Sequence, residues 1–263
     1  GDLIYLAPDG LRTIAGTERI GDVELGTVSK QIQDRISDIG TDNITSTIIR
    51  SKSQYRLFFP TTAQTEILSK GIIAVLKANP ETGTLGFEYA DLKGIKPSST
   101  DSFFISDVET VVHGGYDGYV YKQESGGAFT RASDTETIRG FYRSPDMPLG
   151  DPGIRKSMQR ALVNYKVNEA IDTANQTFRL RYNFDDTNTP QPNAYSFSSA
   201  QVAAFYNSGV YGTSAYGSSG FPLERVSVEG SGFVVAFKLE DQSSKQALSL
   251  RGFELEYVNG GRR

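Results

Sequence analysis

The stretch from Ser144 to Lys166 reads SPDMPLGDPGIRKSMQRALVNYK. Its first ten residues include three prolines and two glycines, which interrupt regular backbone hydrogen bonding and favour turns. A basic run follows and leads into the apolar, strand-like sequence ALVNYK. The stretch therefore predicts a boundary between two β-rich parts of the chain, which we place at residues 1–143 and 144–263.

Composition excludes several classes of protein. Of the 263 residues, 38% are hydrophobic and 22% are charged, and the net charge is −4, so a core and a solvated surface are both available. Because the chain has no cysteine, it has no disulfide and no thiolate metal site. His113 is the single histidine, which excludes a cluster of several histidines around a metal. No apolar run approaches the roughly 18 residues that a membrane-spanning helix needs.

The beginning of the chain, GDLIYLAPDG, lacks the basic and apolar regions of a signal peptide. It starts with Gly1 rather than methionine and enters a strand-like run directly. We therefore expect a fragment or a processed product, whose missing N-terminal part would complete the first domain.

Short apolar runs separated by turn residues recur through the first part. They predict a hairpin over residues 2–15 around Ala-Pro-Asp-Gly, and strands at residues 44–50, 54–60, 71–78, 85–90 and 107–121. This spacing is typical of a propeller, a barrel or a sandwich, all of them all-β architectures.

One segment of the first part predicts a helix. Val28, Ile32, Ile36 and Ile39 are spaced four, four and three residues apart, which places them on one helical face. Thr27 or Ser29 can cap its start, and a glycine follows at position 40. We expect a short helix that packs on a sheet.

The second part predicts an antiparallel β-sandwich. In residues 177–184, Phe178, Leu180, Tyr182 and Phe184 alternate with polar residues, which is the period of a half-buried strand. Further strands are expected at residues 224–229, 232–239 and 248–258.

Two groups of residues are candidates for contacts with partners. Tyr206, Tyr211 and Tyr216 lie in a loop rich in glycine, serine and tyrosine, which is either a surface excursion or a contact loop, since tyrosines supply contact area at low entropic cost. Arg155, Lys156 and Arg160 are the second group. We interpret these cations as subunit contacts or solvated charges, because a DNA binder normally has a broader basic footprint.

No catalytic pattern rises above background. A Ser-His-Asp triad would have to use His113, and no G-x-S-x-G elbow is present. His113 lies near Glu109 and Asp117, a combination that is more common in turns than in active sites. We therefore expect a protein that is not an enzyme and that uses no cofactor and no metal.

Several segments in order resemble a known family. APDG at residues 7–10, VSKQIQDRI at 28–36, YRLFFP at 55–60 and GGYDGYVY at 114–121 are similar to the propeller part of podovirus tail proteins, the nozzle or tail-tube proteins of T7-like phages. PLGDPGIRKSMQRALVNYK at 148–166 and LRGFELEYVNGGRR at 250–263 resemble the C-terminal portion of the same family. The similarity is weakest between residues 190 and 222.

The resemblance implies a fold and a role. The fold would be all-β, with the last blades of a propeller and one short helix followed by an antiparallel β-sandwich. The role would be that of a structural virion protein in the phage tail, assembled as a hexameric ring around the channel for genome ejection. Its partners would be adaptor and fibre proteins, and double-stranded DNA would pass without specific binding.

The charge distribution is compatible with such a conduit. Residues 1–140 carry 14 Lys and Arg against 19 Asp and Glu, a net charge of −5. Two other hypotheses stay open: a carbohydrate-binding module for receptor recognition, motivated by the tyrosine-rich loop, and a hydrolytic propeller enzyme that would depend on His113.

Overall fold

The computed structural model describes residues 3–8, 10–14, 27–37, 39, 43–59, 69–78, 85–131, 134–166, 172–197, 223–243 and 248–262. The predicted all-β class is confirmed, since antiparallel sheets dominate these residues and a single short α-helix accompanies them. The chain divides into two compact units, Gly1–Ser125 and Gly126–Arg263. Each unit is described by itself.

The first unit opens with the expected hairpin. Strands β1 (Ile4–Ala7) and β2 (Gly10–Thr13) pair antiparallel around the predicted turn. The helical segment follows as a 3₁₀ turn, η1 (Lys30–Ile32), and a short helix, α2 (Gln33–Ser37). It starts later than Thr27 because Val28 N donates to Leu11 O (2.9 Å) and Ser29 Oγ accepts from Leu11 N (2.9 Å). These bonds tie the start of the segment to β2.

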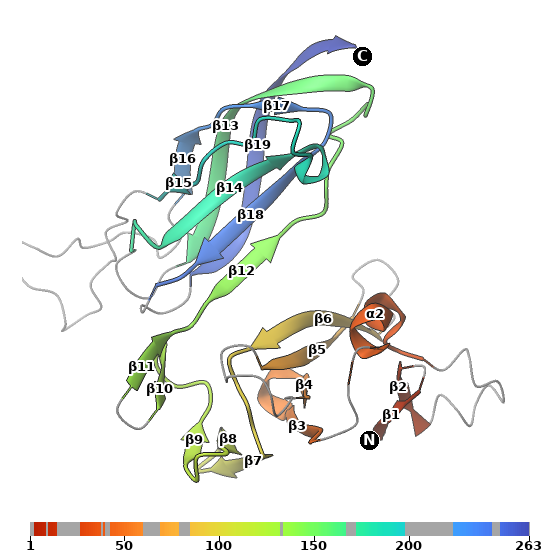
Figure 1. The fold of residues 1–263 in the computed structure, drawn as a ribbon, viewed down its shortest axis with the longest axis vertical. Coiled ribbons are helices and arrows are strands. Elements are labelled where there is room, and N and C mark those ends of the chain that lie inside the picture. The colour runs from red at the N-terminus through yellow and green to blue at the C-terminus, as the bar shows by residue number, and fades with distance from the viewer. Residues whose placement is uncertain are drawn as a thin grey trace, which may run out of the picture. The chain divides into compact units, whose positions relative to one another are not determined.

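A four-stranded meander forms the largest sheet of this unit (Figure 1). Its strands pair in sequence order, and they are β3 (Thr45–Ile49), β4 (Gln54–Phe58), β5 (Lys70–Ala78) and β6 (Leu85–Lys93). A 3₁₀ turn, η2 (Arg50–Lys52), joins β3 to β4. Ile36 of α2 is buried with apolar residues of β2, β4 and β5, so the predicted apolar face of the helix does pack on the sheet.

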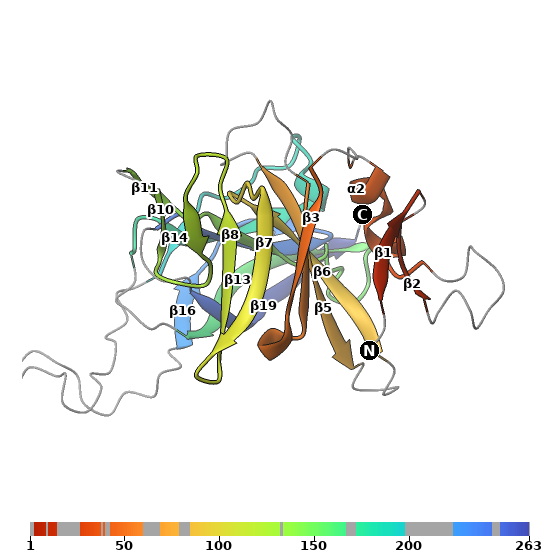
Figure 2. The ribbon, with the colours of Figure 1, turned by 90° about the horizontal axis from the view of Figure 1, so that it is seen from below.

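A second, three-stranded meander completes the first unit. Its strands are β7 (Ser99–Ile105), β8 (Val108–Gly114) and β9 (Val120–Lys122). Figure 2 shows β7 beside β3. The contact is polar, because Thr100 Oγ1 of β7 donates to Ser46 O (3.0 Å) and lies 3.2 Å from Thr45 Oγ1. The sequence did not lead us to expect β7.

Two four-stranded antiparallel sheets build most of the second unit, as predicted for a sandwich. A separate hairpin, β10 (Ala128–Arg131) with β11 (Asp134–Thr137), precedes them. The first sheet has the order β12 (Gly140–Arg143), β18 (Val235–Asp241), β14 (Gln176–Tyr182) and β15 (Tyr195–Ser196). In the second sheet β13 (Ile154–Lys166) pairs on one side with β16 (Leu223–Ser227) and β17 (Ser231–Gly232), and on the other with β19 (Ser249–Arg262).

A column of aromatic rings fills the space between these sheets. Phe237 of β18 is fully buried and stacks on Phe253 of β19, with ring centroids 4.4 Å apart. Phe178 of β14 lies 5.4 Å from Phe237 and 5.4 Å from Phe197. Since these rings come from both sheets, they join the two layers into one core.

The predicted alternation of β14 is confirmed for Phe178, Leu180 and Tyr182, which are fully buried. The prediction is wrong for Phe184, which is 72% exposed. The strand ends at Tyr182, and the next three residues adopt positive φ values of 51°, 59° and 61° in the turn η4 (Asn183–Asp185). The chain therefore leaves the sheet before the alternation reaches Phe184.

The opening stretch does not lie between the compact units, which divide after Ser125. Ser144 N donates to Phe237 O (2.9 Å), and Met147 exchanges two backbone hydrogen bonds with Val235. The first residues of the stretch thus continue β12 along β18 before the chain reaches β13 in the other sheet. Its prolines and glycines therefore allow the crossing from one layer of the sandwich to the other.

Candidate functional site

The three cations predicted as contacts lie along β13 but differ in exposure. Lys156 is 1% exposed, and its Nζ donates to the carbonyl oxygens of Asp151 and Phe233. Arg155 is exposed, and its Nε donates to Ser231 Oγ (2.9 Å). Arg160 is about half-exposed and pairs across the strands with Glu256 (3.1 Å). Of these three cations, Arg155 and Arg160 therefore present their side chains at the surface, and Lys156 does not.

An irregularity in β13 explains this difference. Lys156 and Met158 face the core, whereas beyond the register shift between Met158 and Arg160 the core positions are Ala161 and Val163. A β-bulge adds one residue to one strand and so changes which residues face inward. Strict alternation counted back from Val163 and Ala161 would turn Lys156 outward, whereas the structure buries it.

The other predicted contact residues, Tyr206, Tyr211 and Tyr216, lie outside the described residues.

A polar network connects the two meanders of the first unit. The guanidinium of Arg56 in β4 is almost fully buried and pairs with Glu124, which follows β9 and also pairs with Lys52 of η2. Arg56 also donates to Gln123 Oε1 (2.8 Å). Burial raises the pKa of Glu124, but hydrogen bonds and charges from Lys52 and Arg56 outweigh it and hold that pKa below its usual range.

Glu109 of β8 makes the second polar link. Its carboxylate accepts hydrogen bonds from the backbone N–H groups of Arg50 (2.8 Å) and Ser51 (2.7 Å) and from Ser102 Oγ (2.7 Å). Desolvation raises the pKa of Glu109, but the bonds from Ser51, Ser102 and Arg50 outweigh it and bring the pKa to about 2. The carboxylate therefore satisfies N–H groups of η2 and fixes that turn against β8.

His113 lies next to this network. Its Nδ1 is 3.3 Å from Gln123 Nε2, and its ring stacks on Tyr121 with centroids 5.3 Å apart. Asp117 accepts hydrogen bonds from Tyr121 Oη and from Tyr119 N. These contacts hold the β8–β9 turn together.

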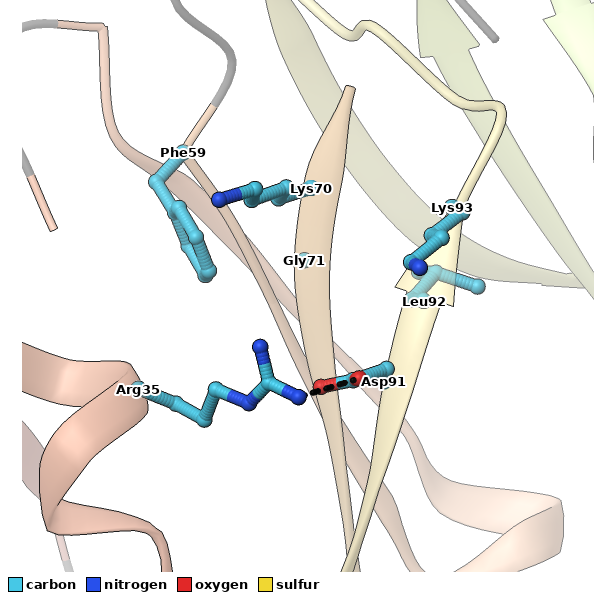
Figure 3. Close-up of a pocket in the computed structure, with 7 residues that line it drawn as sticks. All are labelled: Arg35, Phe59, Lys70, Gly71, Asp91, Leu92 and Lys93. Carbon is cyan, nitrogen blue, oxygen red and sulfur yellow. Dashed lines mark ion pairs between the residues drawn. The ribbon is translucent and has the colours of Figure 1, made fainter. Parts of the chain in front are cut away.

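A small hollow lies between α2 and the ends of β5 and β6 (Figure 3). Its volume is about 60 Å³, which is room for a few water molecules at roughly 10–15 Å³ each. Arg35 reaches across from the helix and pairs with Asp91 (3.4 Å), while Lys70 and Lys93 stand at the strand ends. Lys70 and Lys93 are direct cross-strand neighbours.

A larger groove opens in the second unit where the edges of the two sheets face each other. We call it the β12–β19 cleft; its volume is about 440 Å³. Phe141 and Tyr142 of β12 and Leu250 and Phe253 of β19 supply its apolar lining, and Asp241 of β18 and Arg251 of β19 line it as well. A cleft of this volume with apolar walls falls in the range of binding pockets, about 300–1,000 Å³.

The sequence does not predict this cleft. Phe141 and Tyr142 belong to GFYR, a run too short to be distinguished as a strand by its period. In addition, the cleft exists only because β12 and β19 meet as edges of different sheets, although they are more than 100 residues apart in the sequence. The adjacent aromatic residues Phe141 and Tyr142 were the feature of the sequence that could have indicated a binding surface here.

In the part of the chain that the structure describes, no group of three or more His, Asp and Glu side chains is placed to hold a metal ion. None of the described helices has the length and apolar character to cross a membrane. No protein-family model matches the chain, and no curated protein matches it in sequence.

Proposed function

We propose that this chain is a structural component of a short phage tail, a nozzle or tail-tube protein that assembles as a ring around the path of the genome. Its role is mechanical and not catalytic, and the ring is hexameric by resemblance. The observation that carries the proposal is the ordered set of sequence segments that resemble podovirus tail proteins.

The positions of these segments support the proposal. Residues 7–10, 28–36, 55–60 and 114–121 correspond to the β1–β2 turn, the helical segment, β4 and the β8–β9 turn of the first unit. The two resembling stretches of the second unit contain β13 and β19, which pair with each other along nearly their whole length. Segments that lie about 90 residues apart in the sequence thus form one structural pair.

The sheet topology of the first unit also agrees with the proposal. Strands β3 to β6 form a meander in sequence order, and a four-stranded antiparallel meander is the unit from which propellers are built. The three-stranded meander β7 to β9 packs beside it through β3 and β7. In the proposed ring these sheets form the wall of the channel.

The charge balance suits a wall along which DNA slides. A protein that neutralises many phosphates holds DNA tightly, whereas residues 1–140 have a net charge of −5. In the proposed mechanism, the acidic balance keeps double-stranded DNA from adhering as it leaves the capsid, and adaptor and fibre proteins dock on the outer loops.

Two measurements test the proposal. Native mass spectrometry and negative-stain imaging of the purified protein should show closed rings, and peptide mass spectrometry of purified virions should find the chain in the tail. A protein that remains monomeric at all concentrations and is absent from virions contradicts the proposal.

The alternative of a carbohydrate-binding module rests on the tyrosine-rich loop, and that loop lies outside the described residues. A glycan array tests it directly. Binding that Tyr211→Ala and Tyr216→Ala abolish would favour receptor recognition over a purely structural role.

A further inference from the structure

The hollow between α2 and the ends of β5 and β6 is lined by three cations and one carboxylate (Figure 3). Arg35 comes from the helix, Lys70 from the first position of β5 and Lys93 from the last position of β6. Asp91 supplies the carboxylate, so the lining has a formal net charge of +2. We call this space the cationic hollow, and it stands out because residues 1–140 as a whole have a net charge of −5.

The register of the sheet places these side chains on one face. Lys70 lies directly opposite Lys93, and two residues further along Ile72 lies opposite Asp91. Residues two apart in a strand point to the same side of the sheet. Ile72 is buried in the same cluster as Ile36 of α2, so this is the side that the helix covers. The lysines of the strands and the arginine of the helix therefore meet around one space.

The two lysines are placed unfavourably unless something compensates their charge. Like charges directly opposite each other on neighbouring strands destabilise a sheet. The one carboxylate of the lining, Asp91, pairs with Arg35. An anion bound beside Lys70 and Lys93 would relieve their repulsion, and this gives the hollow a reason to bind one.

The arginine and one lysine have donors available for a ligand. Arg35 contacts Asp91 through Nη2 alone, at 3.4 Å, and its side chain is 60% exposed. Figure 3 shows the other terminal nitrogen of Arg35 turned away from Asp91, and Lys70 extending its ammonium toward Phe59. Within the described ranges Lys70 has no ion pair, whereas Lys93 makes another interaction. We therefore assign direct binding to Arg35 and Lys70, with Lys93 adding its charge nearby.

We propose that the cationic hollow binds a phosphate dianion, either free phosphate or the terminal phosphate of a small ester. The guanidinium of Arg35 donates to two phosphate oxygens, which its planar fork matches. The ammonium of Lys70 donates to a third. The inference goes beyond the proposed role in the tail and does not depend on the ring.

The charge and size of the hollow favour this ligand over other anions. A phosphate monoester carries a charge of about −1.5 to −2 at pH 7 and three strong acceptor oxygens, which matches the net charge of +2 in the lining. A carboxylate would balance half of that charge. A phosphodiester of DNA carries a single charge and is joined to sugars on both sides, which a hollow of about 60 Å³ does not admit.

Isothermal titration calorimetry of inorganic phosphate into the full chain gives the first test. At neutral pH and about 0.1 M salt, we expect one phosphate bound per chain. Lys70→Gln and Arg35→Gln each remove a charged hydrogen bond and should each weaken the affinity about tenfold or more. Both side chains are exposed, so the variants should fold, and circular dichroism checks this. No binding up to about 10 mM phosphate, or an affinity that neither substitution changes, overturns the proposal.

The matched control is Lys77→Gln. Lys77 belongs to the same strand as Lys70 and is exposed, and it pairs with Glu88. Its loss changes the charge of the chain by the same amount, about 20 Å along β5 from the hollow. Phosphate affinity should stay the same in this variant. A loss equal to that of Lys70→Gln would mean that phosphate responds to overall charge and not to a site.

Asp91→Asn tests the sign of the electrostatic effect. This substitution removes the one negative charge of the lining and leaves the guanidinium of Arg35 to the ligand. It should strengthen phosphate binding several-fold. Weaker binding by this variant would contradict an anion held by Arg35 and Lys70.

Two further ligands separate the possible sources of the phosphate group. Tighter binding of glycerol 3-phosphate than of inorganic phosphate assigns the site to a small ester, and equal or weaker binding assigns it to free phosphate. Short duplex DNA should not compete with either. If duplex DNA binds in a manner that Lys70→Gln abolishes and neither small phosphate binds, the proposal is overturned.

Thermal melting gives a readout that is independent of titration heats. Phosphate should raise the melting temperature of the wild type by mass action, and sodium chloride of equal ionic strength should raise it less. Lys70→Gln should lose this response to phosphate. Equal effects of phosphate and chloride would indicate screening alone and contradict the site. Rings that bind no phosphate overturn this inference and leave the proposed function standing, whereas a monomer that binds phosphate does the reverse.

Discussion

Arg56 is a buried charge of the first unit, with 5% of its surface exposed. Its guanidinium lies between Glu124, Gln123 and Gln54, which come from two different meanders. Glu124→Gln should destabilise the first unit by about 2 kcal/mol, since removing one partner of a buried ion pair costs about 3–5 kcal/mol and the partial exposure of Glu124 reduces that cost. Urea unfolding followed by circular dichroism measures the change.

The matched control for Glu124 is Glu88→Gln. Glu88 pairs with Lys77 in the same unit at 3.1 Å, but both side chains are more than half exposed. This substitution should change the free energy of unfolding by less than about 1 kcal/mol. Equal effects of the two substitutions would mean that the Arg56 pair is not desolvated.

Glu109 makes stability depend on pH. Its pKa of about 2 in the folded chain lies below the value of about 4.3 for an unfolded chain. Its contribution is therefore complete above about pH 5 and disappears as the pH falls through 4.3 towards 2. The melting temperature of Glu109→Gln should be lower than that of the wild type at pH 7, and the difference should vanish near pH 2. A difference that persists at pH 2 would contradict the role of the ionised carboxylate.

At the scale of elements, the sandwich depends on rings that join its sheets. Phe237→Ala removes the ring that stacks on both Phe253 and Phe178 and should destabilise the second unit by about 4 kcal/mol. Phe184→Ala, at a site 72% exposed in η4, should change stability by less than about 0.5 kcal/mol. Denaturant melts of both variants check the difference, and similar values would contradict the observed end of β14.

These two phenylalanines show how far the sequence could predict the strands. The period of two correctly indicates the inward face from Phe178 to Tyr182, because that period follows from strand geometry alone. It fails at Phe184 because three consecutive residues with positive φ end the strand. No simple pattern distinguishes Asn183-Phe184-Asp185 from one more step of the strand.

Long-range pairing explains the other differences. The breaks between Ser144 and Gly153 were recognisable, but their position between two sheets follows from hydrogen bonds of Ser144 and Met147 to β18, about 90 residues later. The exposure of Arg155 and the burial of Lys156 likewise depend on a bulge opposite β19. Local sequence indicates where a strand breaks and not which strand it meets.

The same reasoning applies to the candidate contact surfaces. Phe104 and Ile105 at the end of β7 and Phe141 of β12 are residues that would belong in a core by composition, and only the fold reveals that they are more than half exposed. Arg155 and Arg160, in contrast, were predictable as charged surface positions. Sequence patterns therefore identify charged surface residues more easily than apolar residues that remain exposed after folding.

At the scale of the whole molecule, each unit has its own apolar core. Leu11, Ile36 and Leu57 belong to the core of Gly1–Ser125, and Phe178 and Phe237 to that of Gly126–Arg263. Units with separate cores unfold separately, so differential scanning calorimetry of the whole chain should resolve two transitions. Glu124→Gln should lower the temperature of one transition and Phe237→Ala that of the other. Because the two sites share no partner, the double variant should show both shifts unchanged. A single transition that both substitutions lower would instead mean that the two cores unfold as one cooperative unit, and the compact units would then be parts of one domain.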